Sequence, residues 1–199
     1  MSGSALQEYA RGILTHVPWE HWVVMVVVSL ALTVILLIRK KCSVYGAIAL
    51  GLTVFMGLVL LDTAVLIRHL GLLRHGTGHN LGFALDRLLH GSKDARSEVI
   101  SNLVVFIPFG FFLAEFLASL KRFSIGCRLG LVSIAAFCLS LCIECFQLIL
   151  HVGFFELTDL VLNTLGGFIG AGLSILGRKI LSMPKPNRHS AASDDVFQR

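Results

Sequence analysis

Five long apolar runs, separated by short polar or basic segments, dominate the sequence. The runs cover residues 22–38, 44–67, 100–119, 128–150 and 157–177. An α-helix needs about 20 apolar residues to cross a bilayer, and each run reaches or approaches that length. Backbone polar groups find no water in the hydrocarbon core, so helices are the natural spanning element. The pattern therefore predicts an all-α fold, a polytopic membrane helical bundle with about five transmembrane helices, over residues 22–180.

The segments outside these runs have patterns of their own. Residues 1–21 are mixed in polarity and end near Trp19, which suits the headgroup layer, so we expect an N-terminal interfacial segment. The long second loop, residues 68–98, carries leucines at helical spacing, which predicts an amphipathic surface helix. These leucines are Leu81, Leu85, Leu88 and Leu89. Residues 181–199 are polar and proline-punctuated, which indicates a disordered polar tail.

Composition supports the bilayer interpretation. Of the 199 residues, 55% are hydrophobic and 15% are charged, whereas soluble domains average about 25% charged residues. The net charge of +5 comes largely from basic clusters at the edges of the apolar runs, which are typical of topology signals rather than of nucleic-acid binding. The clusters are Arg39-Lys40-Lys41, Lys121-Arg122 and Arg178-Lys179. They predict an N-out, C-in orientation with membrane lipids as neighbours and no nucleic-acid partner.

Cysteine and histidine spacing gives little support for a metal or redox site. Cys138, Cys142 and Cys145 recur at helical spacing within one apolar run, and we interpret them as small packing residues. Cys142 and Cys145 also have C-x-x-C spacing, but both lie inside that apolar run, which favours packing. His75 and His79 are four residues apart in a glycine-rich loop without a nearby acidic or cysteine ligand. We therefore expect no metal and no cofactor.

Strongly polar residues recur near one end of each of the last four runs. They are Asp62, Asn102, Glu144, Gln147, Asp159 and Asn163. If successive helices alternate in direction, all of them fall in one layer, on the outer side under the predicted orientation. Glu144 and Gln147 are three residues apart, and Asp159 and Asn163 are four apart, so each pair shares a helix face.

A buried charge in a membrane is costly, about 2.5–3.5 kcal/mol at the centre of a span, so such residues indicate function. Asp62, Asn102 and Asp159 could instead mark helix ends, and Asp159 could be a helix cap. We predict a ligand-binding set at this layer. Its members are Asn102, Glu144, Gln147, Asp159 and Asn163.

Three motifs in this part of the chain resemble a known family. Residues 102–110 read N-x-x-x-F-x-P-x-G, residues 144–147 read E-x-x-Q, and residues 159–166 read D-x-x-x-N-x-x-G. In this order and spacing they are similar to the VanZ-like family, over roughly residues 46–177. The resemblance implies a multi-pass protein of the bacterial cytoplasmic membrane. The name-giving relatives lower susceptibility to the glycopeptide teicoplanin.

The turn before Asp159 departs from the family pattern. Relatives usually carry an arginine a few residues before the aspartate, whereas residues 151–156 contain none. His151 is the only cation available there, and Glu156 can stand for the first acidic residue of the family motif. An anion contact made by that arginine in relatives is therefore not expected in the same form here.

Proline and glycine residues in the motifs predict structural roles. Pro108 and Gly110 lie inside the third run, and Gly166 and Gly170 form a small-x-x-x-small pair in the fifth. Such a pair lets another helix backbone approach closely. The partner helix could belong to the same chain or, in a helix-mediated oligomer, to a second copy.

Several functions fit this polar layer. The first is binding of an amphiphilic or lipid-linked glycan, or of a glycopeptide antibiotic, in an outer-leaflet polar pocket. The alternative is an intramembrane enzyme that acts on a lipid-linked envelope substrate, with Glu144 and Asp159 as an acid-base pair. No serine or cysteine nucleophile accompanies them at a telling spacing, which counts against acyl transfer. A proton-coupled transporter and a purely structural role remain further alternatives.

Overall fold

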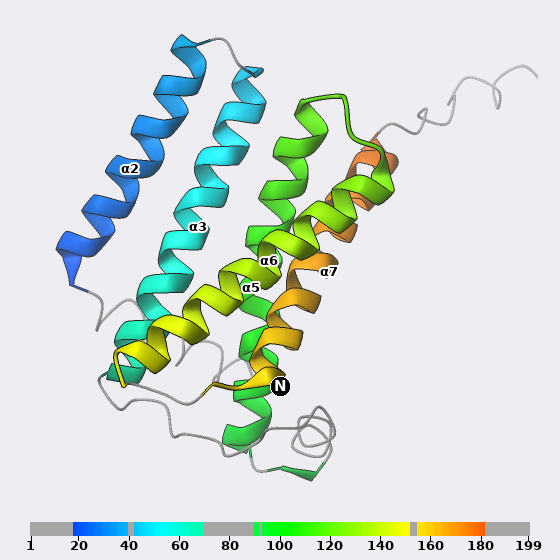
Figure 1. The fold of residues 1–199 in the computed structure, drawn as a ribbon. Coiled ribbons are helices and arrows are strands. Elements are labelled where there is room, and N and C mark those ends of the chain that lie inside the picture. Colours follow the sequence, from blue (N-terminus) through cyan, green and yellow to red (C-terminus); the bar gives the residue numbers. More distant parts are fainter. Residues whose placement is uncertain (1–17, 40–41, 70–89, 92, 152–154, 182–199) are drawn as a thin grey trace, which may run out of the picture.

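The computed structural model describes residues 18–39, 42–69, 90–91, 93–151 and 155–181 (Figure 1). Among them, five helices are long and apolar enough to cross a membrane, which confirms the predicted all-α bundle. They are α2 (Trp19–Ile38), α3 (Val44–His69), α5 (Lys93–Ser119), α6 (Ile125–Ile149) and α7 (Leu157–Leu181).

Helix boundaries extend beyond several of the apolar runs. α5 begins at Lys93, in the charged stretch before the predicted start at residue 100. Hydropathy marks only the part of a helix that suits hydrocarbon, while good helix formers such as Ala95 and Arg96 continue the helix into the interface. The predicted amphipathic helix, the interfacial residues before Pro18 and the polar tail after Leu181 lie outside the described residues.

Successive helices run in opposite directions (Figure 1). One end of the bundle, here called the carboxylate end, holds the starts of α2, α5 and α7 and the ends of α3 and α6. The opposite end is called the basic end. The most extensive helix contact joins α5 to α7, and among the described helices α2 contacts only α3. The bundle therefore has a tight α5–α7 centre and a peripheral α2.

Glycines set the closeness of the α5–α7 contact. Gly166 and Gly170 face the backbone of α5, where an added Cβ would overlap the carbonyl oxygens of Leu103 and Ile107. Gly110 faces Gly167 of α7 in the same way. Small residues are needed here because only they allow two helix backbones to approach so closely. The helix that packs on Gly166 and Gly170 is thus α5 of the same chain.

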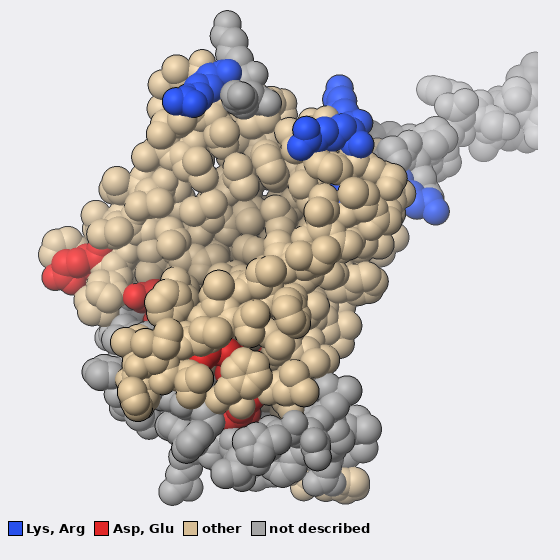
Figure 2. All heavy atoms as spheres, in the orientation of Figure 1, with Lys and Arg blue, Asp and Glu red and all other residues tan. Residues whose placement is uncertain are grey.

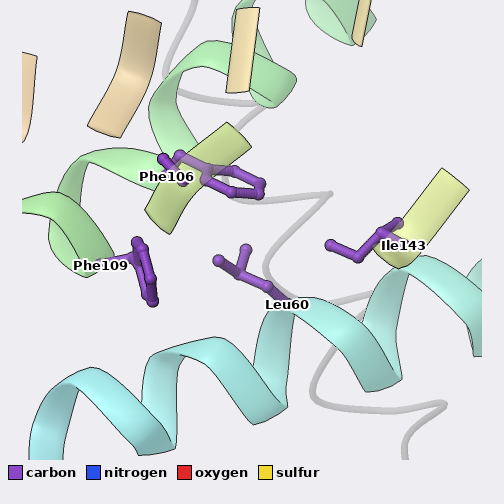
Figure 3. Packing of buried hydrophobic residues seen from close by; sticks show 5 residues of the cluster. Leu60, Phe106, Phe109 and Ile143 are labelled. Atoms are coloured by element: carbon purple, nitrogen blue, oxygen red, sulfur yellow. The ribbon is translucent and has the colours of Figure 1, made fainter. Parts of the chain in front are cut away.

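Two apolar clusters fill the bundle. The first joins Leu60 of α3 to Phe106 and Phe109 of α5 and Ile143 of α6, with Leu60 pointing toward the two rings (Figure 3). The second lies nearer the basic end and contains aliphatic residues of α5, α6 and α7. Its buried members are Ala114, Leu117, Val132 and Ala171. Between them these clusters fix the rotation of the helices, and so determine which faces turn inward.

Charge is distributed unevenly between the two ends. The Lys and Arg side chains visible on the face shown in Figure 2 lie at the basic end, and the visible Asp and Glu lie toward the other. The basic end holds described basic residues that follow α2 and α5, that lie in the first turn of α6, or that lie in the last turn of α7. They include Arg39, Lys121, Arg122, Arg128, Arg178 and Lys179. Clusters of this kind predict a cytoplasmic face by the positive-inside tendency, while Arg68, Lys93 and Arg96 lie at the carboxylate end.

The cysteines of α6 correct one expectation. Cys138, Cys142 and Cys145 are free thiols on exposed positions of α6. They share a helix face, as their spacing predicts, but that face is turned away from the bundle. The packing role inferred from sequence is wrong, because spacing reveals that residues share a face and not which way the face points.

Candidate functional site

Polar side chains are buried together toward the carboxylate end of α6 and α7. Glu144 and Gln147 are each 1% exposed, Asp159 is 7% and Asn163 is 6% exposed. They occupy the inward faces of their helices, while neighbours such as Phe146 point outward. With their partners they form what is called here the polar cluster. Its members are Asn102, Ser140, Glu144, Gln147, Glu156, Asp159 and Asn163.

Glu144 is tied to the start of α7. Its Oε2 accepts the backbone N–H of Glu156 at 2.9 Å. The carbonyl of Glu156 in turn accepts the N–H groups of Asp159 at 3.1 Å and of Leu160 at 3.4 Å, which begin the helix. Glu144 therefore fixes the point at which the chain turns from α6 into α7, and through it the position of Asp159.

Three side-chain amides connect the remaining helices. Asn102 of α5 donates through Nδ2 to Asp159 Oδ1 at 2.5 Å. Asn163 of α7 donates to the Ser140 hydroxyl of α6 at 2.8 Å. Gln147 of α6 donates to the Ala64 carbonyl of α3 at 3.1 Å. The five residues predicted to bind a ligand thus lie at one end of the bundle, each hydrogen-bonded to a neighbouring segment.

Asp62 belongs to a separate contact. Its Oδ1 lies 2.7 Å from Nδ1 of His21, which joins α3 to α2. Its Oδ2 is buried and has no hydrogen-bond partner among the residues described. The sequence placed Asp62 in the same layer as the polar cluster, but nothing in the apolar pattern pointed to His21, because a residue at a helix start is ordinarily interfacial.

Glu156 and Ser140 were not predicted as members of the site. Glu156 is 4% exposed and Ser140 is fully buried. Ser140 could have been found from its position, since it lies four residues before Glu144 and thus on the same helix face. Glu156 gave a weaker signal, because an acidic residue just before a helix is commonly a surface residue near the helix dipole.

Another buried carboxylate, separate from the polar cluster, lies at the basic end and was not predicted from the sequence. Glu115 of α5 is 4% exposed. It accepts hydrogen bonds from Ser174 Oγ at 2.6 Å, from Arg178 Nε at 3.0 and 3.1 Å and Nη2 at 2.5 Å, and from the Tyr45 hydroxyl. The Arg178 guanidinium also lies over the Tyr45 ring. This network joins α3, α5 and α7. The sequence could have pointed to it, because Glu115 is an acidic residue inside the third apolar run.

The chemistry offered by the polar cluster is hydrogen bonding within a buried setting. Glu144 accepts from a backbone N–H and Asp159 from an amide, so each carboxylate is held by a separate donor. Two amide oxygens, Gln147 Oε1 and Asn163 Oδ1, are buried and accept no hydrogen bond within the part of the chain that the structure describes. The cluster therefore retains acceptor capacity after its internal bonds are made.

Comparison with known proteins assigns the chain to a family. The family described as VanZ/LLP1 matches residues 12–178, which is most of the sequence. This chain belongs to the VanZ/LLP1 family. A curated relative, Protein VanZ of Enterococcus faecium, is 34% identical over 91 residues, or 46% of this chain and 52% of the relative. The match thus spans about half the length of that relative, and no solved structure matches the chain.

In this VanZ/LLP1 protein the family match includes the whole polar cluster and the Glu115 network. The turn from 151 to 156 lacks the arginine expected from the family motif, and its described residues are His151, Phe155 and Glu156. His151 is exposed and has a positive φ of 55°. The residue that stands out in this turn is therefore Glu156, whose N–H is bonded to Glu144.

Proposed function

We propose that this VanZ/LLP1 protein is a multi-pass protein of the bacterial cytoplasmic membrane, oriented N-out and C-in. In this proposal it binds an amphiphilic or lipid-linked glycan, or a glycopeptide, at the polar cluster in the outer leaflet. Binding there would alter susceptibility to glycopeptides of the teicoplanin type. The observation that carries the proposal is the burial of Glu144 and Gln147, at 1% exposure each, within a membrane-length helix.

The free-energy cost of burying these polar groups indicates that they have a function. A polar group buried without a partner costs about 1–3 kcal/mol, and charged groups cost more. Helix association alone would be served by the glycine contacts of α5 and α7. Polar side chains from α5, α6 and α7 that meet at one end therefore indicate recognition of a polar headgroup whose chain lies in the bilayer. Sugar hydroxyls fit such a surface because they form hydrogen bonds with both amides and carboxylates.

The test combines membrane abundance with glycopeptide susceptibility in cells that depend on this protein. Glu144→Ala is expected to remove the phenotype at near-normal abundance, because it leaves the Glu156 N–H and the ligand without an acceptor. Asp159→Asn is expected to retain partial function, since an amide keeps the shape and still accepts a hydrogen bond from Asn102. Normal susceptibility behaviour of an abundant Glu144→Ala protein would refute the proposal.

The acid-base alternative gives a different result in the same experiment. If Glu144 and Asp159 exchange protons with a substrate, Glu144→Gln and Asp159→Asn should both be inactive at full abundance, because an amide cannot take up or release the proton. If the carboxylates only hold helices together, abundance and phenotype should fall in proportion. Mass spectrometry of lipids that co-purify with the wild-type protein, and are absent from the Glu144→Ala protein, would identify the ligand.

A further inference from the structure

The amides of the polar cluster share one arrangement. Each uses its N–H group on the protein: Gln147 on the Ala64 carbonyl, Asn102 on Asp159, and Asn163 on Ser140. The oxygen of each amide is left without a donor from the described residues. Gln147 Oε1 and Asn163 Oδ1 are buried without a partner among the described residues, and no described residue donates to Asn102 Oδ1.

Chemistry fixes this orientation for two of the three amides. A backbone carbonyl can only accept a hydrogen bond, so the nitrogen of Gln147 must face Ala64 and the oxygen must face away. A carboxylate likewise fixes the nitrogen of Asn102 against Asp159. The Ser140 hydroxyl can donate or accept, so it does not by itself fix which end of the Asn163 amide faces it. The oxygens of Gln147 and Asn102 are therefore the acceptors that the fold itself imposes.

We infer that the polar cluster selects ligands by hydrogen-bond donors, that is, by hydroxyl or ammonium N–H groups in the headgroup. The inference rests on the proposed function and narrows its ligand class. A buried acceptor without a donor costs about 1–3 kcal/mol, a cost that a ligand hydroxyl or N–H removes. A headgroup with acceptor atoms alone gains nothing from Gln147 Oε1. Gln147 is accordingly the specificity-determining residue.

Matched amphiphiles separate donor recognition from general hydrophobic binding. The full-length protein is reconstituted in phosphatidylcholine nanodiscs, whose headgroups carry no O–H or N–H donor. Dodecyl maltoside, which carries hydroxyls, is compared with dodecyldimethylamine oxide, which is uncharged overall and only accepts. Dodecylammonium is compared with dodecyltrimethylammonium, which has the same charge without N–H groups. Apparent Kd values come from the rise in Tm on titration, at concentrations that leave the discs intact.

The expected result is a saturable rise in Tm with dodecyl maltoside or dodecylammonium, and none with its donor-free counterpart. A rise with the maltoside identifies hydroxyls as the recognised source, and a rise with the ammonium identifies N–H groups. Gln147→Met, which keeps the length of the side chain, should weaken the apparent affinity roughly three- to tenfold, the value of one hydrogen bond. Ser133→Ala on the same helix should leave the apparent affinity unchanged, because among the described residues its hydroxyl bonds to the Leu129 carbonyl of its own helix.

Other outcomes overturn the inference without deciding the proposed function. Equal rises in Tm with donor and donor-free probes would show that the protein does not recognise the headgroup through its hydrogen-bond donors. An affinity unchanged in a folded Gln147→Met protein would remove the role of that residue. No shift with any probe would indicate that an internal water already satisfies the amide oxygens. The proposed function is judged separately by the Glu144→Ala phenotype. If Gln147→Met does not fold, the comparison of probes on the wild-type protein still decides.

Discussion

At the scale of single residues, Glu115 and Glu144 show two ways to accommodate a carboxylate in a membrane bundle. Glu115 receives donors from Tyr45, Ser174 and Arg178, so its charge is matched by a cation at the basic end. Glu144 accepts the N–H of Glu156 in the part of the bundle farthest from the basic residues that begin α6 or end α7. The first arrangement pairs a carboxylate with a cation between helices, and the second ties a carboxylate to the backbone at the start of α7.

Replacement of Glu115 should therefore affect stability rather than recognition. Glu115→Leu would leave Arg178, Ser174 and Tyr45 without their shared acceptor, and we expect a loss of about 1–3 kcal/mol, because Arg178 is partly exposed and can be rehydrated. Glu115→Gln should lose less, since the amide oxygen still accepts. The measurement is the Tm of the purified protein in detergent. Glu20→Gln, at an exposed position in the first turn of α2, serves as the control.

Two results would contradict a stabilising role for Glu115. If Glu115→Leu keeps the wild-type Tm but loses the glycopeptide phenotype, the network at the basic end is part of the functional machinery. If Glu115→Leu and Glu20→Gln behave alike in both measurements, the hydrogen bonds of Glu115 contribute nothing detectable.

At the scale of helices, close packing of α5 on α7 positions Asn102 against Asp159. Gly166 lies one turn from Asn163, so the glycine contact and the polar cluster occupy consecutive turns of α7. A change in the distance between the two helices would therefore move the Asn102–Asp159 hydrogen bond. The small residues determine the geometry, and the polar residues depend on it.

Replacement of a glycine of α7 by alanine should lower the stability of the protein only on the face that packs against α5. Gly166→Ala would overlap the Leu103 carbonyl, so the helices must separate, at a cost of about 1–3 kcal/mol. Gly172→Ala on the same helix meets nothing within 4 Å, and alanine favours the helix by up to about 1 kcal/mol. Thermal unfolding of both variants provides the measurement. Equal Tm values for the two would contradict the packing of α5 on α7.

At the scale of the whole molecule, the distribution of charge predicts how the bundle is oriented in the membrane. The basic end collects Arg39, Lys121, Arg122, Arg178 and Lys179, and the polar cluster lies toward the other end. By the positive-inside tendency, we predict that the basic end faces the cytoplasm and that the polar cluster faces the outer leaflet. In that orientation, the proposed ligand site would lie on the side of the membrane where envelope glycans and glycopeptides are found.

The orientation can be measured by cysteine labelling in intact cells. In a variant whose native cysteines are replaced by serine or alanine, Ser190→Cys should remain unlabelled by a membrane-impermeant maleimide until the membrane is permeabilised. Ser4→Cys should be labelled from outside under the same conditions. The reverse pattern would invert the bundle and would place the polar cluster in the inner leaflet, which is inconsistent with binding of an external glycopeptide.

The sequence by itself determined the helices and the layer in which polar residues gather. Length and hydropathy of each run depend on local composition, and alternation of direction then places Asp62, Asn102 and Asp159 at one end without any knowledge of packing. The spacing of Glu144 and Gln147 likewise fixes a shared helix face. These features follow from the geometry of a single helix, which the chain carries in its own order of residues.

Only the tertiary structure decided which faces meet. It paired Asp62 with His21, bonded Glu144 to the backbone of Glu156, and turned the cysteines of α6 away from the bundle. Helical spacing is the same for an inward and an outward face, so it cannot supply the rotation of a helix. That rotation is set by the fit of Gly166 and Gly170 against the backbone of α5 and by apolar contacts between helices distant in sequence.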